Sequence, residues 1–415
     1  MKALVVQNQV RAADVAVINI RNWPAWAVAI LYALFGMCLP LMAAILPEER
    51  ADVLYHSYDG DDVSVNGPSI LARKSMSKYT SIYANYYADS VTSASIDVRL
   101  GASQYTEDRT EYSFGADWLV DNSTISAGYT NSEENDYTSN TYHFGISHTM
   151  FGDLTTVNLG FSYGDDEVRR NLRDIDGNII GNDPGFGKRP LARRNYRLGV
   201  TQIMSKNLIM NLAFEAVTDE GYTQNPYRTA LRYDTTDIII NGVRIPSFQQ
   251  ENYPDVRTSD AIALRANYYL PYRGAIHAEY KFYTDTWGVK ADTYKLEYVH
   301  PFRDQWTFDV SYRYYIQDQA DFYKDVYDQS ETNLLYYGRD KELSAFTSQG
   351  YGFGVQYEFL KGGWWQFDKA SANFAYERMD FKYDNFTDYD RNSPNLGKLF
   401  RFSADVVQIY FSVWY

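Results

Sequence analysis

Ten charged side chains recur at alternate positions of apolar segments between residues 197 and 377, and their types and spacing suggest chemistry. Alternate residues of a β-strand share one face, so each set would point to one side of a sheet. Charges of both signs around a polar interior would create a transverse field that orients a polar solute. The same charges could instead form salt-bridge ladders that only hold the wall together. These lumen-lining candidates are Arg197, Arg265, Glu279, Lys281, Lys295, Glu297, Asp309, Arg313, Glu358 and Glu377.

Small residues occupy the equivalent positions of the preceding segments. In one interpretation, an infolded loop such as 164–192, or a segment of a partner, packs against this wall of small side chains. In the other, glycine and serine relieve crowding where a closed sheet curves. The residues are Ser113, Gly115, Ser126, Gly128, Gly145, Ser147, Gly160 and Ser162.

Catalytic chemistry has less support in the sequence. His143 and His277 have the inward phase of their segments, whereas His148 and His300 lie at segment ends beside short turns. A lipase on a barrel surface would need a serine, a histidine and a polar orienting group together on the lipid-facing side. The sequence has no HExxH motif, and its one cysteine, Cys38, lies in no CxxCH motif. We therefore expect no enzyme activity, no catalytic residue and no cofactor.

Acidic residues cluster in three predicted loops. Carboxylates of this kind can bind Ca²⁺, but none of the clusters has EF-hand spacing. A solvated acidic rim is the alternative, so the sequence leaves metal binding undecided. The formal net charge is −14, and no basic patch is evident in the sequence. Both observations argue against a nucleic-acid partner. The clusters are Asp59, Asp61 and Asp62, then Glu133, Glu134 and Asp136, and then Asp165, Asp166 and Glu167.

The elements that would position these residues are strands. From residue 51 onward, segments of about ten residues alternate between apolar and polar side chains. Seven tight turns, such as Asp121-Asn122 and Ser205-Lys206, interleave with eight longer polar connections, such as 59–66, 164–192 and 218–256. This pattern predicts an all-β protein, a transmembrane up-and-down antiparallel β-barrel of about 16 strands. The chain is 17% aromatic, with 39 Tyr, which suits aromatic belts at two membrane interfaces.

The last nine residues, VQIYFSVWY, predict the closing strand of the barrel. Their alternate apolar side chains would face lipid, and a strand that ends on an aromatic residue resembles the signal read by the barrel assembly machinery. Closure would pair this strand with the one near Val53–Tyr55, because open edges are not tolerated in hydrocarbon. The predicted assembly signal comprises Val407, Ile409, Phe411, Val413 and Tyr415.

The N-terminal residues 1–44 read as a cleaved secretory signal peptide, with basic residues before an uncharged apolar run from Trp23 to Ala44. The run is also about long enough for a retained membrane anchor. We expect the outer-membrane β-barrel to comprise residues 45–415.

Several stretches resemble an uncharacterised family of Gram-negative outer-membrane barrel proteins, known as a domain of unknown function. They include ADVLYHSYDGDD (51–62), NGPSILARK (66–74), GDDEVRRN (164–171), TDEGYTQNPYR (218–228), YYLPYR (268–273), QADFYKD (319–325) and KELSAF (341–346). The resemblance implies a cell-envelope context near thioredoxin-like and flavin-transferase-type proteins, and it brings no activity.

The sequence thus predicts an integral protein of the bacterial outer membrane, a porin-like pore or export conduit of unknown substrate. The alternative is a plugged barrel that scaffolds a partner of an envelope redox, flavin or thioredoxin-like system. A barrel enzyme is a third possibility with little support. Expected partners are outer-membrane lipid and lipopolysaccharide, the barrel assembly machinery, and periplasmic redox or lipoprotein partners.

Overall fold

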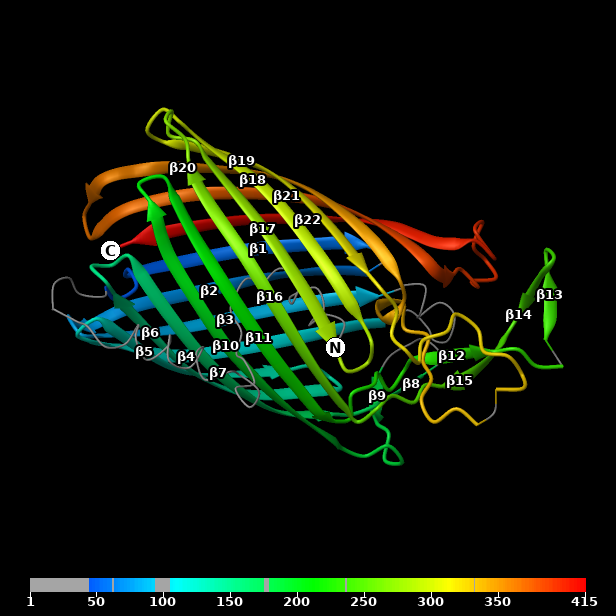
Figure 1. Cartoon of the computed structure of the whole chain (residues 1–415). Helices are drawn as coiled ribbons and strands as arrows, with labels where there is room; N and C mark the ends of the chain where they lie inside the picture. Colours follow the sequence, from blue (N-terminus) through cyan, green and yellow to red (C-terminus); the bar gives the residue numbers. More distant parts are fainter. Residues whose placement is uncertain (1–44, 62, 94–104, 175–178, 236, 332) are drawn as a thin grey trace, which may run out of the picture.

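Sixteen antiparallel strands close into one barrel (Figure 1), in the order β1–β7, β10, β11 and β16–β22. The computed structural model describes residues 45–61, 63–93, 105–174, 179–235, 237–331 and 333–415. The predicted signal peptide, residues 1–44, lies outside these residues. In the described part of the chain, no helix has the length and apolar character needed to cross a membrane. The predicted fold class and strand number are confirmed.

All sixteen barrel strands are longer than the ten residues expected. Their bounds are β1 Arg50–Gly60, β2 Val63–Ser77, β3 Thr80–Ser93, β4 Tyr105–Val120, β5 Ser123–Glu133, β6 Tyr137–Met150, β7 Thr155–Val168, β10 Arg189–Ser205, β11 Leu208–Gly221, β16 Val256–Tyr269, β17 Ala275–Asp285, β18 Lys290–Phe302, β19 Trp306–Gln317, β20 Phe346–Trp364, β21 Phe367–Thr387 and β22 Leu399–Trp414.

Successive connections lie at opposite ends of the barrel, as predicted. We call the end with the short turns the turn end, and the end with the remaining connections the loop end. Seven short turns and both ends of the barrel chain lie at the turn end, and eight connections lie at the loop end. The prediction of a long loop at 59–66 was wrong. Gly60 pairs directly with Val63, so β1 and β2 continue almost to the turn at residue 61. Val63 and Val65 are buried on one face, and that apolar alternation extends the strand.

Apolar side chains cover the outer wall. On β19 the outward residues Trp306, Val310, Tyr312 and Ile316 are 37–51% exposed. Ten residues of a strand tilted by about 40° rise roughly 25 Å, which matches the apolar band of an outer-membrane barrel. Outward aromatic pairs form a girdle on this wall, with ring centroids 5.1–5.3 Å apart: Tyr86–Tyr112, Tyr129–Tyr142, Phe161–Tyr196, Tyr280–Tyr294 and Tyr312–Tyr351.

The seam between β1 and β22 closes the barrel, as the last nine residues predicted. Val53 pairs with Phe411 and Tyr55 with Ile409, and all four side chains are 42–51% exposed. The structure also explains the adjacent charges of β2. Arg73 bonds Asp117 inside the barrel, whereas the Lys74 ammonium lies 4.8 Å from the ring centroid of Tyr415. Lys74 therefore lies at the turn end, on the face opposite Arg73.

The loop end carries three small sheets and an apolar core. The sheets are β8 (Asn171–Arg173) with β9 (Ile179–Asn182), β12 (Thr229–Arg232) with β15 (Ser247–Gln250), and β13 (Ile238–Ile240) with β14 (Val243–Ile245). The last two project beyond the barrel in Figure 1. Below them, Tyr253, Trp287 and Leu343 of the loops pack against Phe346 and Phe381 of the barrel wall. Loops and barrel therefore share one core at the mouth. A 3-10 turn, η2 (Lys341–Leu343), lies in it.

Candidate functional site

The barrel interior is identified by side chains that meet across an intervening strand. The guanidinium of Arg73 on β2 bonds Asp117 on β4, and this contact crosses the intervening strand β3. Nε2 of His56 on β1 lies 2.6 Å from Oδ1 of Asp89 on β3, and this contact crosses the intervening strand β2. Such contacts form only on the concave face of a curved sheet, so these residues point inward.

The wall of small residues is partly covered by the protein's own side chains. The Tyr83 ring lies over Gly115 and Gly128, where an added Cβ at Gly128 would lie 2.8 Å from the Tyr83 hydroxyl. The Arg197 side chain lies over Gly160, 3.4 Å from such a Cβ. These contacts support the interpretation that small residues relieve crowding. The described contacts of the 169–188 connection lie at the mouth, for example the T-shaped pair of Phe186 and Tyr222.

We predict that Gly115→Ala destabilises the barrel by about 1–3 kcal/mol, because a methyl group there would clash with the ring of Tyr83. The temperature at which the folded band disappears in an unboiled gel should fall. The double variant G115A/Y83A should recover most of the loss, because it removes the ring that the methyl group meets. An unchanged transition temperature in G115A would contradict this packing.

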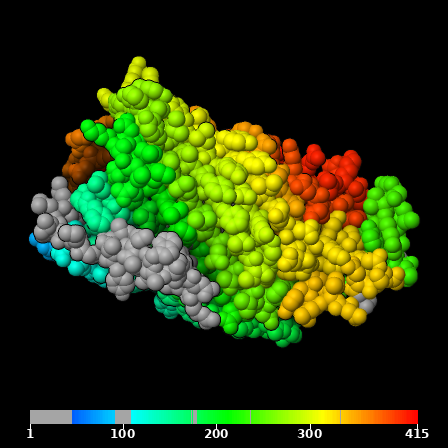
Figure 2. Space-filling view, viewed as in Figure 1, coloured from blue at the N-terminus to red at the C-terminus, as the bar shows by residue number. Residues whose placement is uncertain are grey.

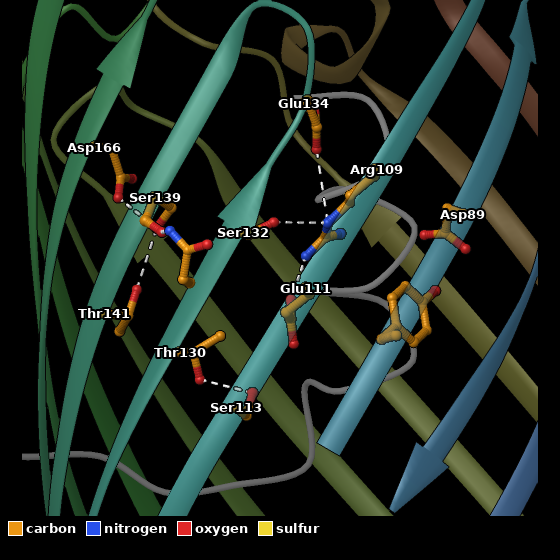
Figure 3. Close-up of polar contacts among 12 residues, drawn as sticks. Asp89, Arg109, Glu111, Ser113, Thr130, Ser132, Glu134, Ser139, Thr141 and Asp166 are labelled. Carbon is orange, nitrogen blue, oxygen red and sulfur yellow. Dashed lines mark hydrogen bonds and ion pairs between the residues drawn. The ribbon is translucent and has the colours of Figure 1, made fainter. Parts of the chain in front are cut away.

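A buried polar cluster occupies the same wall toward the loop end (Figure 3). Arg109 on β4 lies 2.6 Å from Glu111, donates from Nε to Ser132 at 3.0 Å, and lies 3.7 Å from Glu134. The side chain of Arg109 is only 3% exposed. Further along the wall, Figure 3 shows a ladder of hydroxyl contacts, in which Ser113 and Thr130 lie 2.9 Å apart and Ser139 donates to Asp166 at 2.6 Å.

The ten charged candidates lie on β10 and β16–β21, on the strand face opposite the exposed apolar side chains of the outer wall. Arg265 bonds Glu279, Lys295 lies 2.8 Å from Glu297, and Arg197 lies 3.5 Å from Glu215. Glu358 lies 3.0 Å from Lys361. Asp309 and Arg313 lie against Gly354 and Gly350 of the next strand, and Glu377 also contacts Gly350. Lys281 shares the face of Glu279 by its position two residues along β17. Their role in conduction stays a prediction.

Buried charge pairs cross the mouth of the barrel. We call Tyr227–Arg228 together with Arg339–Ser344 the mouth strap. Lys341 of the strap bonds Asp61 in the β1–β2 turn. Arg228 bonds Asp340 and lies 3.5 Å from Glu342, so it joins the two strap segments.

The other end of the strap reaches the opposite side of the mouth. The Tyr227 hydroxyl accepts the backbone N–H of Asn171 at 2.7 Å and also bonds Asp136 of the β5–β6 connection. The strap is held from below as well. The backbone N–H of Arg339 donates to Glu251 at 2.6 Å, and its guanidinium lies 2.9 Å from Asp325. A continuous set of polar contacts therefore spans the mouth.

Exposure of interior cations changes along the barrel axis. The side chains of Arg228 and Lys341 at the mouth are 7% and 11% exposed. Near the middle of their strands, the side chains of Arg197, Lys295 and Arg265 are 41%, 42% and 21% exposed. The described residues thus seal the mouth more tightly than the middle of the barrel.

Two ionisable groups at the mouth, a carboxyl and a tyrosine hydroxyl, lie in an environment that disfavours their charged forms. Burial, together with nearby Glu134, raises the pKa of Asp136 above its ordinary value. Burial and the adjacent Glu251 carboxylate raise the pKa of the Tyr253 hydroxyl, which donates to Glu251 at 2.6 Å. Both shifts follow from removal of these groups from water.

Residues 100–383 match the family described as "Protein of unknown function (DUF3570)". The chain belongs to this family. The strap residues of this DUF3570 barrel lie in stretches that carry the resemblance, Arg228 in TDEGYTQNPYR and Lys341 at the start of KELSAF. Sequence reasoning assigned those stretches no role, because loop residues show no periodicity that could reveal their contacts.

Solved barrels resemble this DUF3570 chain only in outline. A bacterial polysaccharide outer membrane secretin is 10% identical, with a TM-score of 0.46 over 89% of this chain and 100% of that one. The siderophore receptor PirA from Acinetobacter baumannii is 11% identical, with a TM-score of 0.43 over 89% of this chain and 60% of that one. A ferric enterobactin receptor, PfeA, from Pseudomonas aeruginosa is 12% identical, with a TM-score of 0.44 and coverages of 88% and 59%.

This chain therefore spans about three fifths of the length of the two receptors. No curated protein gives a significant sequence match. The scores are too low to say anything about the substrate or partner of the DUF3570 barrel.

The histidines and acidic clusters of the DUF3570 barrel form no complete catalytic or metal site among the described residues. Ser123 Oγ lies 2.8 Å from His148 Nδ1 at the turn end, on the outer face. No described side chain bonds Nε2 of His148, so an orienting group is missing there. The described His, Cys, Asp and Glu side chains include no group of three placed to hold a metal ion.

Proposed function

We propose that this chain is an outer-membrane pore or export conduit for a polar substrate, and that the mouth strap closes it on the loop side. The observation that carries the proposal is the difference in exposure between interior cations. In the middle of the barrel, Arg197 and Lys295 keep about two fifths of their side-chain surface and Arg265 about one fifth, whereas Arg228 and Lys341 of the strap keep about a tenth or less. An accessible charged interior beneath a closed mouth is the arrangement of a gated channel.

The proposed location rests on the outer wall. An apolar band roughly 25 Å tall with an aromatic girdle requires a hydrocarbon environment. A closed barrel leaves no unpaired strand edge there, and inward charges such as Arg265 and Glu279 stay in a polar lumen. The loop end would face the outside and the turn end the periplasm.

Planar lipid bilayers provide the test. Purified protein, shown to be folded by its gel shift on heating, should give rare discrete current steps separated by long closed periods. The steps should favour one sign of ion, because the interior charges are fixed. A fully folded barrel that never conducts, whatever the voltage, would contradict the conduit.

A plugged barrel that scaffolds a periplasmic or envelope redox partner is the second candidate. The observation that favours it is the extent of burial at the mouth, where Arg339, Glu251 and Tyr323 are at most 4% exposed. A permanent plug predicts no conductance even after the strap is weakened, together with a partner that co-purifies from native membranes. Strap variants therefore separate the two functions.

A further inference from the structure

Two cations face each other on the outer wall near the loop end. Lys382 on β21 and Arg401 on β22 are direct register partners. Their neighbours in sequence, Phe381 and Phe400, belong to the interior core, so these two side chains point outward. Both are exposed. This part of β22 lies at the surface, in the red region of Figure 2.

Like charges directly opposite each other in a sheet are destabilising unless something compensates them. Two other outward cations of this barrel have a carboxylate of their own. Arg194 lies 3.0 Å from Glu220, and Arg378 lies 3.0 Å from Asp405. Among the described residues, no carboxylate lies within ion-pair distance of Lys382 or Arg401.

The nearest acids of this wall do not neutralise the pair. Asp380, the next outward residue of β21 toward the membrane, accepts the Ser403 hydroxyl at 2.6 Å and lies 3.7 Å from Arg378. Asp384, the next outward residue in the other direction, is exposed and forms no ion pair with a described residue. An anion from outside the chain is therefore the missing partner of Lys382 and Arg401.

The height of the pair selects the kind of anion. Tyr376 pairs with Phe353, two residues from Tyr351 of the aromatic girdle, and its hydroxyl donates to Asp405 at 2.6 Å. Lys382 lies six residues further along β21, which is about 15 Å higher for a strand tilted by about 40°. The headgroup layer of ordinary phospholipids is only roughly 5–8 Å thick. A phosphate at this height must be carried on a larger headgroup, such as a phosphorylated sugar.

We propose that Lys382 and Arg401 bind a phosphate group of a glycolipid in the outer leaflet. Arginine and lysine together offer charge and several N–H donors to phosphate oxygens. The site rests on the proposed outer-membrane location, because it needs the outer wall to face lipid. The bound glycolipid would contact the outer wall at β21 and β22, beside the closing seam.

Native mass spectrometry of the detergent-purified full-length protein tests the site. The probe is lipid A, a diphosphorylated disaccharide lipid, and it is compared with its dephosphorylated form, with phosphatidylglycerol and with inorganic phosphate. Wild-type protein should retain lipid A and lose the dephosphorylated form. The variant K382S/R401S should bind lipid A at least about tenfold more weakly, because two charge-assisted contacts are lost.

The matched control, K206S/R303S, removes two exposed cations at the turn end and should bind as wild type does. Equal binding by K382S/R401S would overturn the site. Equal retention of phosphatidylglycerol, or displacement of lipid A by millimolar inorganic phosphate, would overturn the assignment to a glycolipid. The gel shift on heating and the bilayer current of K382S/R401S should match those of wild type, so failure of this site is distinct from failure of the conduit.

Discussion

Lys341→Met should open the barrel. The substitution removes the cation that bonds Asp61 and leaves that carboxylate, whose side chain is 3% exposed, without its ammonium partner. Breaking a buried ion pair costs about 3–5 kcal/mol, and about 1.4 kcal/mol corresponds to a factor of ten in an equilibrium. The closed state alone bears this cost, so the open fraction in planar bilayers should rise by roughly 100-fold or more.

Two further variants make this result specific. D61N/K341M removes both charges of the pair together, so it should return most of the way to the wild-type open fraction. Lys188→Met removes another loop-end cation, which lies 2.9 Å from Glu167 but is 70% exposed, and it should change little. The conduit would be contradicted if a folded K341M protein stayed as closed as wild type, and the plugged scaffold would then be favoured.

Deletion of Phe411 to Tyr415 should reduce assembled barrel in the outer membrane by an order of magnitude or more. The deletion removes the partners of Arg50 to Val53, which are four of the eleven register pairs of the seam, and exposes that part of the β1 edge to hydrocarbon. Tyr415→Ala should have a smaller effect of about 1–2 kcal/mol. It loses the hydroxyl that donates to the Arg73 carbonyl at 2.8 Å and the ring beneath Lys74.

The measurement is the amount of heat-modifiable protein in outer-membrane fractions, with processed protein in the periplasm as the readout of export. Export should be unchanged in both variants. Tyr415→Phe is the matched control, since it keeps the ring and loses only the hydroxyl, and it should assemble better than Tyr415→Ala. Wild-type amounts of assembled deletion variant would refute an essential closing role.

The barrel could be predicted because its signals are local. Alternation along each strand placed the outward aromatic residues and the ten inward charges on opposite faces. The alternation of short turns and longer loops along the sequence predicted the number of strands. The seam followed from the demand that every strand edge be paired in lipid.

The mouth strap could not be predicted because its contacts are distant in sequence. Lys341 and Asp61 are 280 residues apart, and neither lies in a periodic segment that would suggest the other. Loop packing depends on how several connections fill one mouth together. The wrong loop at 59–66 has a related cause, since polar residues such as Asp59 were taken to end a strand that continues into water.

The pairing of the first and last barrel strands has a consequence for the timing of folding. Arg50 and Trp414 are register neighbours, so the first strand made must wait for the last before the sheet can close. Contacts of such high sequence separation slow folding, because a long chain must be ordered before they form. Until then β1 has a free edge that can pair with other chains, which makes the unassembled chain prone to aggregation. Slow closure and the need for a protected intermediate are thus built into the order of the strands.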